Sequence, residues 1–123
     1  FEGGNFSVRF FPYQKYGKFL PNIYKDIMLS GFINREKLDI LHIIGMENTI
    51  PPKFSGRVVL TSRGIGRLKM PELYPPYVVK KARMIKKIIA ENAENLHMIV
   101  SSQELKDDTA EFMGIPKEKI SVV

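Results

Sequence analysis

The sequence predicts an α/β fold: a three-layer, Rossmann-like sandwich with a mainly parallel sheet. Short, nearly continuous apolar runs alternate along the chain with longer segments whose apolar residues recur at helical spacing. Such runs are typical of strands buried on both faces by flanking helices. Strands that alternate with helices favour a parallel sheet. A chain of 123 residues is expected to form a single domain, residues 1–123.

The first third of the chain predicts a strand, a helix and a second strand. Apolar and polar residues alternate over 6–11, which indicates a strand. Over 20–33 the apolar residues recur at helical spacing, and Pro21 suits a first helical turn. The apolar run over 38–44 predicts the next strand.

The middle third predicts a strand, a long connection and the strongest helix. Residues 57–61 are rich in β-branched side chains and predict a buried strand. Glycines and prolines mark 62–76 as a long connection, and long ordered loops in compact domains are often functional. Apolar residues at helical spacing then predict a helix over 77–93.

The last third predicts one strand–helix–strand unit of a parallel sheet. Residues 96–100 indicate a buried strand, and 120–123 indicate another. Ser101 with Glu104 fits a capping box at the start of the intervening helix. Gly114 is placed to end that helix with a positive φ.

Two predicted strands end in loops that carry polar and glycine residues. Parallel strands deliver the loops that follow them to the same edge of the sheet, where open α/β folds bind their ligands. Arginine side chains there could hold a phosphate bidentately. Two alternatives stay open: a hydrogen-bonded core histidine, and arginines that only face water. The candidate binding residues are His42, Gly45, Glu47, Asn48, Arg63 and Arg67.

The net charge of +6 and the pI near 9.6 suit three kinds of anionic partner: nucleic acid, an anionic membrane surface or phosphorylated small molecules. Nucleic acid ranks last because no aromatic stacking motif or recognition-helix pattern is visible. Lys80, Lys81 and Lys87 are candidates for membrane or phosphate contact. The alternative is that the helix packs through its apolar stripe and its lysines only face water.

Neither a metal site nor a cofactor is expected. The chain has no cysteine and only two histidines, His42 and His97, which are far apart in sequence. The Gly-x-Gly at Gly64 lacks the third glycine of a dinucleotide fingerprint, because Lys69 stands there. No apolar run approaches the length that spans a bilayer. A cytoplasmic location is expected, with peripheral contact with a membrane as a further option.

The segment 96–123 resembles part of a known enzyme family. Its order of strand, Val-Ser, helix, Gly-Ile-Pro-x-x-Lys-Ile and strand is similar to that of nucleotide-sugar-dependent glycosyltransferases of the GT-B type, family 4 or group 1. Asp39, His42 and Gly45 match that family's Asp-(Ile/Val)-(Ile/Val)-His-x-His-Gly strand, and Arg83 resembles a family arginine. The resemblance implies the N-terminal, acceptor-side domain of such an enzyme, without the donor half.

The resemblance implies transfer of a sugar from a nucleotide donor to an acceptor hydroxyl or a lipid phosphate. It also has departures. The family's second histidine is Ile44 here, and its His-Asp pair at the next strand end is Arg63 and Gly64. Neither residue acts as a general base near neutral pH, so the catalytic residues stay unassigned. The rival interpretation is a non-enzymatic Rossmann-like module that binds an anionic ligand or a protein partner.

The resemblance predicts that the 123-residue chain transfers no sugar by itself. In enzymes of this type the donor site lies mainly in the second domain, which this sequence does not contain. The check is an assay of the purified chain against a panel of nucleotide sugars with phosphorylated acceptors. Turnover of any of them above the buffer blank would contradict the prediction.

Overall fold

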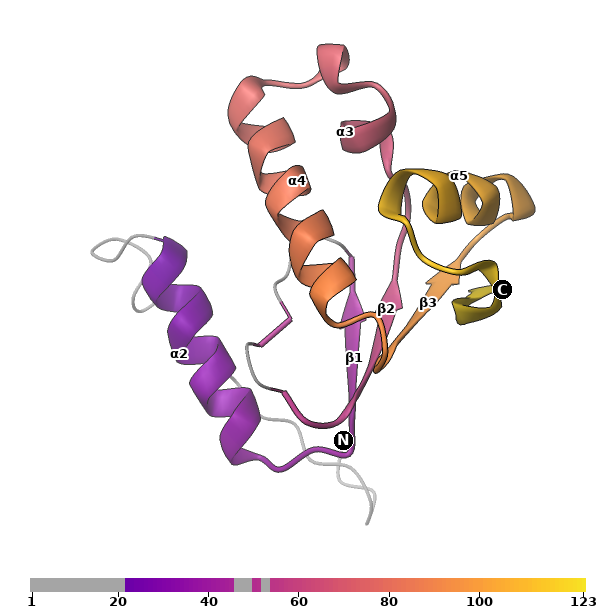
Figure 1. The fold of residues 1–123 in the computed structure, drawn as a ribbon. Coiled ribbons are helices and arrows are strands. Elements are labelled where there is room, and N and C mark those ends of the chain that lie inside the picture. The colour runs from indigo at the N-terminus through magenta and orange to yellow at the C-terminus, as the bar shows by residue number, and fades with distance from the viewer. Residues whose placement is uncertain (1–21, 46–49, 52–53) are drawn as a thin grey trace, which may run out of the picture.

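The computed structural model describes residues 22–45, 50–51 and 54–123, so the strand predicted over 6–11 lies outside the described residues. Within the described part, helices and strands alternate along the chain (Figure 1). The elements are α2 (Asn22–Arg35), β1 (Ile40–Ile44), β2 (Arg57–Thr61), α3 (Gly66–Lys69), the 3-10 helix η1 (Pro71–Leu73), α4 (Pro76–Glu91), β3 (Leu96–Val100), α5 (Gln103–Met113), the 3-10 helix η2 (Lys117–Lys119) and β4 (Ile120–Val122).

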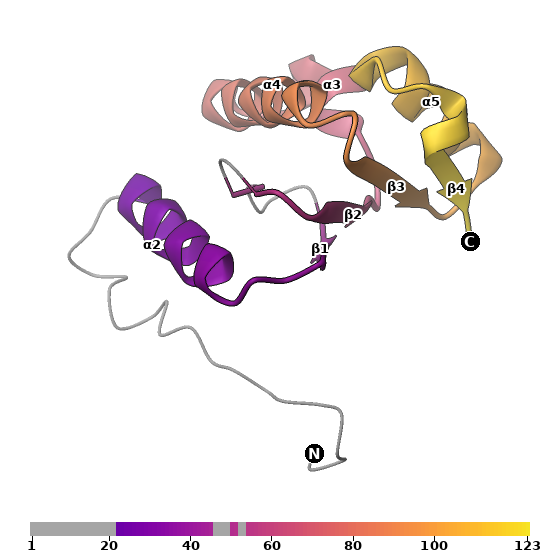
Figure 2. The ribbon, with the colours of Figure 1, turned by 60° about the horizontal axis from the view of Figure 1, so that its bottom comes forward.

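The four described strands form one parallel sheet in the order β1-β2-β3-β4. Each crossover moves to the next strand in the same direction, and right-handed crossovers therefore place their helices on the same side. Figure 2 shows α3, α4 and α5 together on one side of the sheet, with α2 beside β1. The fold class is α/β with a parallel sheet flanked by helices, consistent with the predicted Rossmann-like three-layer sandwich.

The core lies between the sheet and α4 with α5. Leu96, Met98 and Val100 of β3 point into it and are at most 2% exposed. Ile85 and Ile89 of α4 lie in the same cluster, because a spacing of four residues keeps both side chains on one helix face. Full burial of a side chain of this size contributes roughly 1.5–3 kcal/mol to the free energy of unfolding.

The observed boundaries lie within two residues of the predicted ones, and two of the differences have a structural reason. β1 begins at Ile40 rather than at residue 38, because its partner β2 begins at Arg57, whose amide donates to Asp39 O at 2.9 Å. The connection predicted over 62–76 contains α3 and η1. These helices are one turn each, too short to show a helical period in the sequence.

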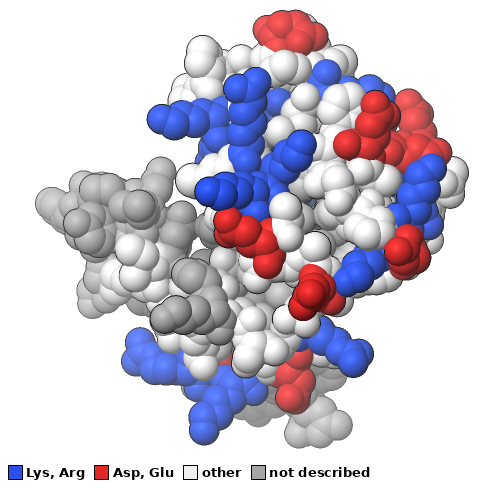
Figure 3. Space-filling view, viewed as in Figure 1, with Lys and Arg blue, Asp and Glu red and all other residues white. Residues whose placement is uncertain are grey.

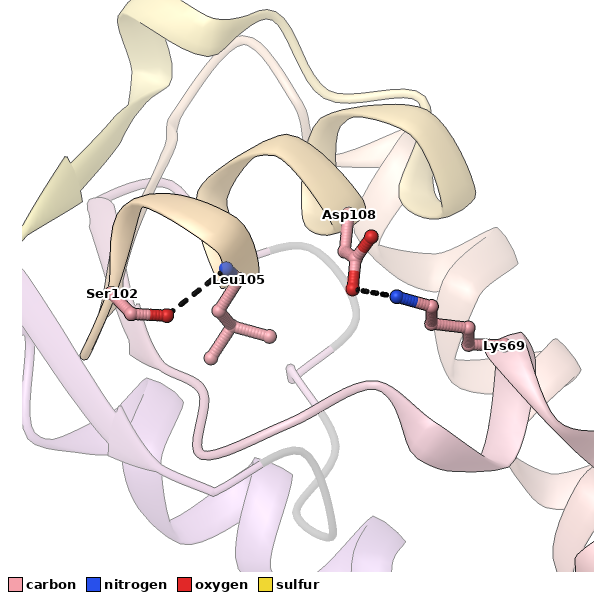
Figure 4. Close-up of polar contacts among 4 residues, drawn as sticks. All are labelled: Lys69, Ser102, Leu105 and Asp108. Atoms are coloured by element: carbon pink, nitrogen blue, oxygen red, sulfur yellow. Dashed lines mark hydrogen bonds and ion pairs between the residues drawn. The ribbon is translucent and has the colours of Figure 1, made fainter.

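The N-cap of α5 corrects a sequence prediction. The capping residue is Ser102, whose Oγ accepts a hydrogen bond from Leu105 N at 3.1 Å (Figure 4). Ser101 is exposed in the bend after β3. With the cap one residue later, Leu105 occupies the third helical position, so Glu104 does not complete a capping box.

The C-terminal end of α5 is as predicted. Gly114 has φ +70°, and its amide donates to Ala110 O at 3.0 Å. A left-handed residue at this position satisfies a carbonyl that the helix end would otherwise leave without a partner. A Cβ on Gly114 would meet nothing within 4 Å, so the requirement for glycine is one of backbone conformation.

Gly114→Ala is expected to lower the free energy of unfolding by about 1 kcal/mol, because Cβ disfavours the left-handed conformation. The matched control is Gly31→Ala inside α2, where no atom lies within 4 Å of the added Cβ. That change should be neutral or stabilising, since alanine is the better helix former. Urea unfolding of both variants checks this. Equal behaviour of the two variants would be incompatible with a backbone cause.

Candidate functional site

A pocket of about 460 Å³ lies at the carboxyl ends of β1 and β2. Its volume falls within the range of small-molecule sites in proteins. The end of β1, the segment that follows β2, and the inner face of α4 all contribute to its walls. The lining residues are Ile44, Gly45, Arg63, Gly64, Ile65, Gly66, Arg67, Leu68, Tyr74, Ala82 and Ile85.

Backbone hydrogen bonds fix the two loops where they leave the sheet. Gly45 N donates to Thr61 O at 2.8 Å, and Gly45 has a φ of +85°, a conformation that glycine adopts without strain. Ser62 N donates to Ile99 O at 2.9 Å, which extends the ladder one residue beyond β2. The buried Ser62 Oγ accepts from Gly64 N at 3.3 Å. Arg63 is therefore held at the tip of a tight turn.

Gly66 and Tyr74 are in close contact across the pocket wall. A Cβ at residue 66 would lie 2.7 Å from Tyr74 Oη, closer than real Cβ contacts allow. The glycine thus lets the tyrosine ring end pack against the start of α3. Tyr74 is half-buried, and its hydroxyl end lies beside the segment that carries Arg67.

An ion pair ties α3 to α5. Lys69 Nζ lies 2.5 Å from Asp108 Oδ2, and Figure 4 shows the two side chains reaching toward each other between the helices. The hydrogen bond to Asp108 raises the pKa of Lys69. Because both side chains are partly exposed, the pair contributes little to stability. The pair links the end of α3, the helix that contains Arg67, to α5.

The charge of the described pocket lining is positive. Arg63 and Arg67 line it, and no described lining residue is a carboxylate. Arg63 is exposed and Arg67 is half-buried. The planar guanidinium group matches the geometry of phosphate and carboxylate groups and binds them through two parallel hydrogen bonds. This pocket is therefore suited to an anionic small molecule.

His42 lies on the opposite face of the sheet from this pocket. In β2, Val58 and Leu60 are buried beneath the helices, so Val59 and Thr61 face the other way. His42 pairs with Val59 and shares its face, and its Nε2 is 2.8 Å from Thr61 Oγ1 in a hydrogen bond. His42 is therefore a hydrogen-bonded strand residue that does not line the pocket.

The other predicted residues have different outcomes. Gly45, Arg63 and Arg67 come together at the pocket, whereas Glu47 and Asn48 lie outside the described residues. Lys80, Lys81 and Lys87 are exposed on α4 and do not line this pocket. The residues that sequence reasoning missed are Tyr74, Gly66 and Asp108, because each acts through a contact between separate elements that has no signature in the local sequence.

A larger cavity of about 690 Å³ lies at the opposite, amino-terminal edge of the sheet. Its lining includes Asp39 together with Lys37 and Arg57, so its charges are of both signs. Open parallel α/β sheets bind ligands at the carboxyl ends of their strands, which favours the smaller pocket as the site.

Two kinds of feature are absent from the described part of the chain. No group of three or more His, Asp or Glu side chains could hold a metal ion there. None of the helices in 22–45 or 54–123 is long and apolar enough to cross a membrane.

Comparison of the chain with protein-family models, with curated proteins and with solved structures found no match. What the pocket can bind is therefore inferred from its own lining residues, which include two arginines, a tyrosine and a glycine-rich turn.

The contact between Gly66 and Tyr74 predicts a coupled pair of substitutions. Gly66→Ala should lower the free energy of unfolding by about 1 kcal/mol, because the added Cβ forces the tyrosine hydroxyl to move. In a Tyr74→Phe background the same change should cost almost nothing, since the next ring atom is 3.5 Å away. A double-mutant cycle from urea unfolding measures the coupling.

The matched control for this cycle is Gly64→Ala, where a Cβ would meet nothing within 4 Å. It should behave alike in both backgrounds. An equal cost of Gly66→Ala with and without the tyrosine hydroxyl would show that the contact does not constrain the loop.

Proposed function

We propose that this chain is the acceptor-side domain of a nucleotide-sugar-dependent glycosyltransferase and that its pocket binds a phosphorylated or carboxylated acceptor. The observation that supports this is the position of Arg63 and Arg67 in one pocket at the carboxyl edge of a parallel sheet. The described lining offers no carboxylate to repel an anion. The reaction class is inferred from the sequence resemblance, and the anionic character of the acceptor is inferred from the pocket.

The pocket favours a phosphate acceptor over a hydroxyl acceptor. A hydroxyl must lose its proton to a general base during transfer, and neither arginine nor glycine at positions 63 and 64 accepts a proton near neutral pH. A phosphate monoester has a second pKa near 6, so its oxygen is already ionised at neutral pH. Arg63 and Arg67 would then orient the group without taking its proton.

In the proposed transfer, an acceptor phosphate oxygen forms a bond to the anomeric carbon of the sugar. The bond from that carbon to the donor's phosphate oxygen breaks, and the nucleoside diphosphate leaves with the electron pair. The role of this chain is to bind and orient the nucleophile, which lowers the entropic cost of the encounter. The donor's nucleotide is bound by groups that this site does not provide.

A second function is a module that binds the same anion without catalysis. The observation that favours it is the pair Arg63 and Gly64, which occupies the strand end where the resembled family has its His-Asp pair. The two functions share the anion site. They differ in whether addition of the donor-binding half of a GT-B enzyme produces sugar transfer.

Arg63→Gln together with Arg67→Gln should abolish binding of glycerol 3-phosphate in calorimetric titration. Each charge-assisted hydrogen bond contributes about 1.5–3 kcal/mol, so at least a tenfold loss per arginine is expected. Binding by the wild-type chain should weaken with added salt, because exposed charges are screened over about 8–10 Å at physiological ionic strength. The melting temperature should change little, because neither arginine belongs to the buried core.

The matched control is Lys37→Gln with Arg57→Gln, which removes two positive charges that line the cavity at the amino-terminal edge. It should leave binding of glycerol 3-phosphate unchanged, and neutral glycerol should not bind to any variant. Equal losses in the two double variants would attribute binding to net charge and overturn the assignment of the site.

A further inference from the structure

The outer face of α4 has a composition that packing does not require. The helix packs on the core through Val79, Ala82, Ile85 and Ile89, all buried. The opposite side carries Tyr77, Lys80, Met84 and Lys87, which fall at helical spacing on one stripe. Lys81 lies at the margin of this stripe, and Leu73 of η1 precedes the helix in the chain.

Large apolar side chains are exposed on this surface. Leu73 is 67% exposed, Tyr77 is 75% exposed and Met84 is 54% exposed. A single exposed apolar residue is ordinary on a protein surface, but Tyr77 and Met84 are exposed on one face of α4, and Leu73 is exposed on the 3-10 helix before it. A solvated helix face has no need of them, and each costs free energy by ordering water around it.

Positive charge surrounds these apolar side chains. The sequence of α4 contains five basic residues and one acidic residue, Glu91. Figure 3 shows lysine and arginine side chains gathered over α4, with acidic side chains toward its margin. Glu91 lies 4.0 Å from Lys87, and both are so exposed that the pair neutralises little of the field.

Lysine and exposed apolar side chains together suit an anionic bilayer surface. A helix that lies in the membrane interface buries its apolar side chains among the acyl chains and places its lysines at the lipid phosphates. Lysine is long enough to keep its ammonium group in water while its stem covers apolar surface. Tyrosine is enriched at this depth because its ring is apolar and its hydroxyl is polar. A nucleic-acid surface would pair with the lysines but would leave Leu73 and Met84 in water.

We propose that the outer face of α4, defined as Leu73, Tyr77, Lys80, Lys81, Met84 and Lys87, binds the surface of an anionic lipid bilayer. Resting on the function proposed above, we also infer that the acceptor is a lipid phosphate taken from that surface.

The positions of two cavities support the inference that the acceptor is a lipid phosphate. A cavity of about 660 Å³ lies between η1 and the amino end of α4, and its charged lining residues are Glu72, Lys80 and Arg83 beside Tyr74 and Val79. Tyr74 also lines the pocket that contains Arg63 and Arg67, and Lys80 belongs to the outer face of α4. The cavity therefore shares one side chain with the docking surface and another with the anion pocket. An amphiphile that stays in the bilayer through its tail needs only its headgroup to reach across Tyr74.

The test is co-sedimentation of the purified 123-residue chain with vesicles made of equal parts phosphatidylcholine and phosphatidylglycerol. Binding is expected to these vesicles and not to pure phosphatidylcholine, and it should weaken at raised salt. Lys80→Gln, Lys81→Gln and Lys87→Gln together should weaken it about 100-fold, since one basic residue near an anionic surface contributes roughly a factor of five. Leu73→Ser with Tyr77→Ser should weaken it with all charges retained.

The matched control removes three positive charges from other elements: Lys37→Gln, Lys106→Gln and Lys117→Gln. It has the same net charge as the α4 lysine variant and should retain vesicle binding within about threefold. Thermal unfolding verifies that the variants are folded, and all of the altered side chains are at the surface or only half-buried. An equal loss of vesicle binding in the two triple variants would show that binding depends on net charge alone and would overturn the proposal.

A single introduced tryptophan gives a second readout, because the chain contains none. Tyr77→Trp should shift its emission to shorter wavelength on addition of the anionic vesicles, whereas Glu118→Trp on the exposed η2 should not shift. Binding of duplex or single-stranded RNA without vesicle binding would assign the lysines to nucleic acid and overturn the proposal. If the Tyr77→Trp variant sediments with vesicles while its tryptophan emission stays unchanged, the outer face of α4 does not contact the bilayer, and the proposal is again overturned.

Failure of this inference and failure of the proposed function are distinguishable. The lysine variant should still bind soluble glycerol 3-phosphate, and Arg63→Gln with Arg67→Gln should still bind vesicles at least half as well as wild type. If the arginine variant alone loses all vesicle binding, the bilayer contact is made by the pocket, and α4 is not the docking face.

Discussion

The backbone ladder at the carboxyl end of the sheet is the constraint on which the site depends. Gly45 N bonds to Thr61 O, and Ser62 N bonds to Ile99 O. Through these two bonds β1, β2 and β3 end at nearly the same level. The turn after β2 and the exit from β1 then have to share one edge. Arg63 and Arg67 reach a common pocket because both lie on the connection that follows β2, and the pairing of β1 with β2 brings Gly45 to the same edge.

Much of the fold could be predicted because the local signals agree with the tertiary structure. The strands β2 and β3 are continuous apolar runs bounded by polar residues, and their observed limits equal the predicted ones. Gly114 is identifiable as a helix stop because glycine is the residue that takes a positive φ without strain. In these segments local preference and packing point to the same structure, as expected of a sequence with a well-defined fold.

Other features could not be predicted, and each has a physical reason. Every residue of β1 except His42 is apolar, so its sequence has no alternation of polar and apolar residues that would indicate the face of each side chain. The orientation of His42 away from the pocket follows only from its pairing with Val59. Ser101 and Ser102 are equivalent by residue type, and the bend that follows β3 determines that Ser102 caps α5. The contact of Tyr74 with Gly66 depends on how η1 folds back, and this arrangement leaves no periodic pattern in the sequence.

The division of charge between elements gives the two proposed surfaces different characters. Two of the four acidic residues of α5 are in ion pairs, since Asp108 pairs with Lys69 and Asp107 pairs with Lys117, which lowers the pKa of Asp107. The basic residues of α4 have one acidic partner on their own helix, so the positive field concentrates there. Arginines in the pocket offer a fixed fork that selects the shape of a phosphate, whereas lysines on α4 are mobile point charges that attract any anionic surface.

These two kinds of positive charge also act differently on stability. Like charges that line one pocket repel each other in the free protein, and a bound anion removes that repulsion. A ligand that binds only the folded state stabilises it by RT ln(1 + [L]/Kd), so the melting temperature rises with the logarithm of the ratio of ligand concentration to Kd once that ratio is large. Charges spread along the solvent side of α4 are screened by salt whether or not a bilayer is present. The pocket can therefore be recognised by the stabilisation that a small soluble anion produces, and the face of α4 by its requirement for an extended anionic surface.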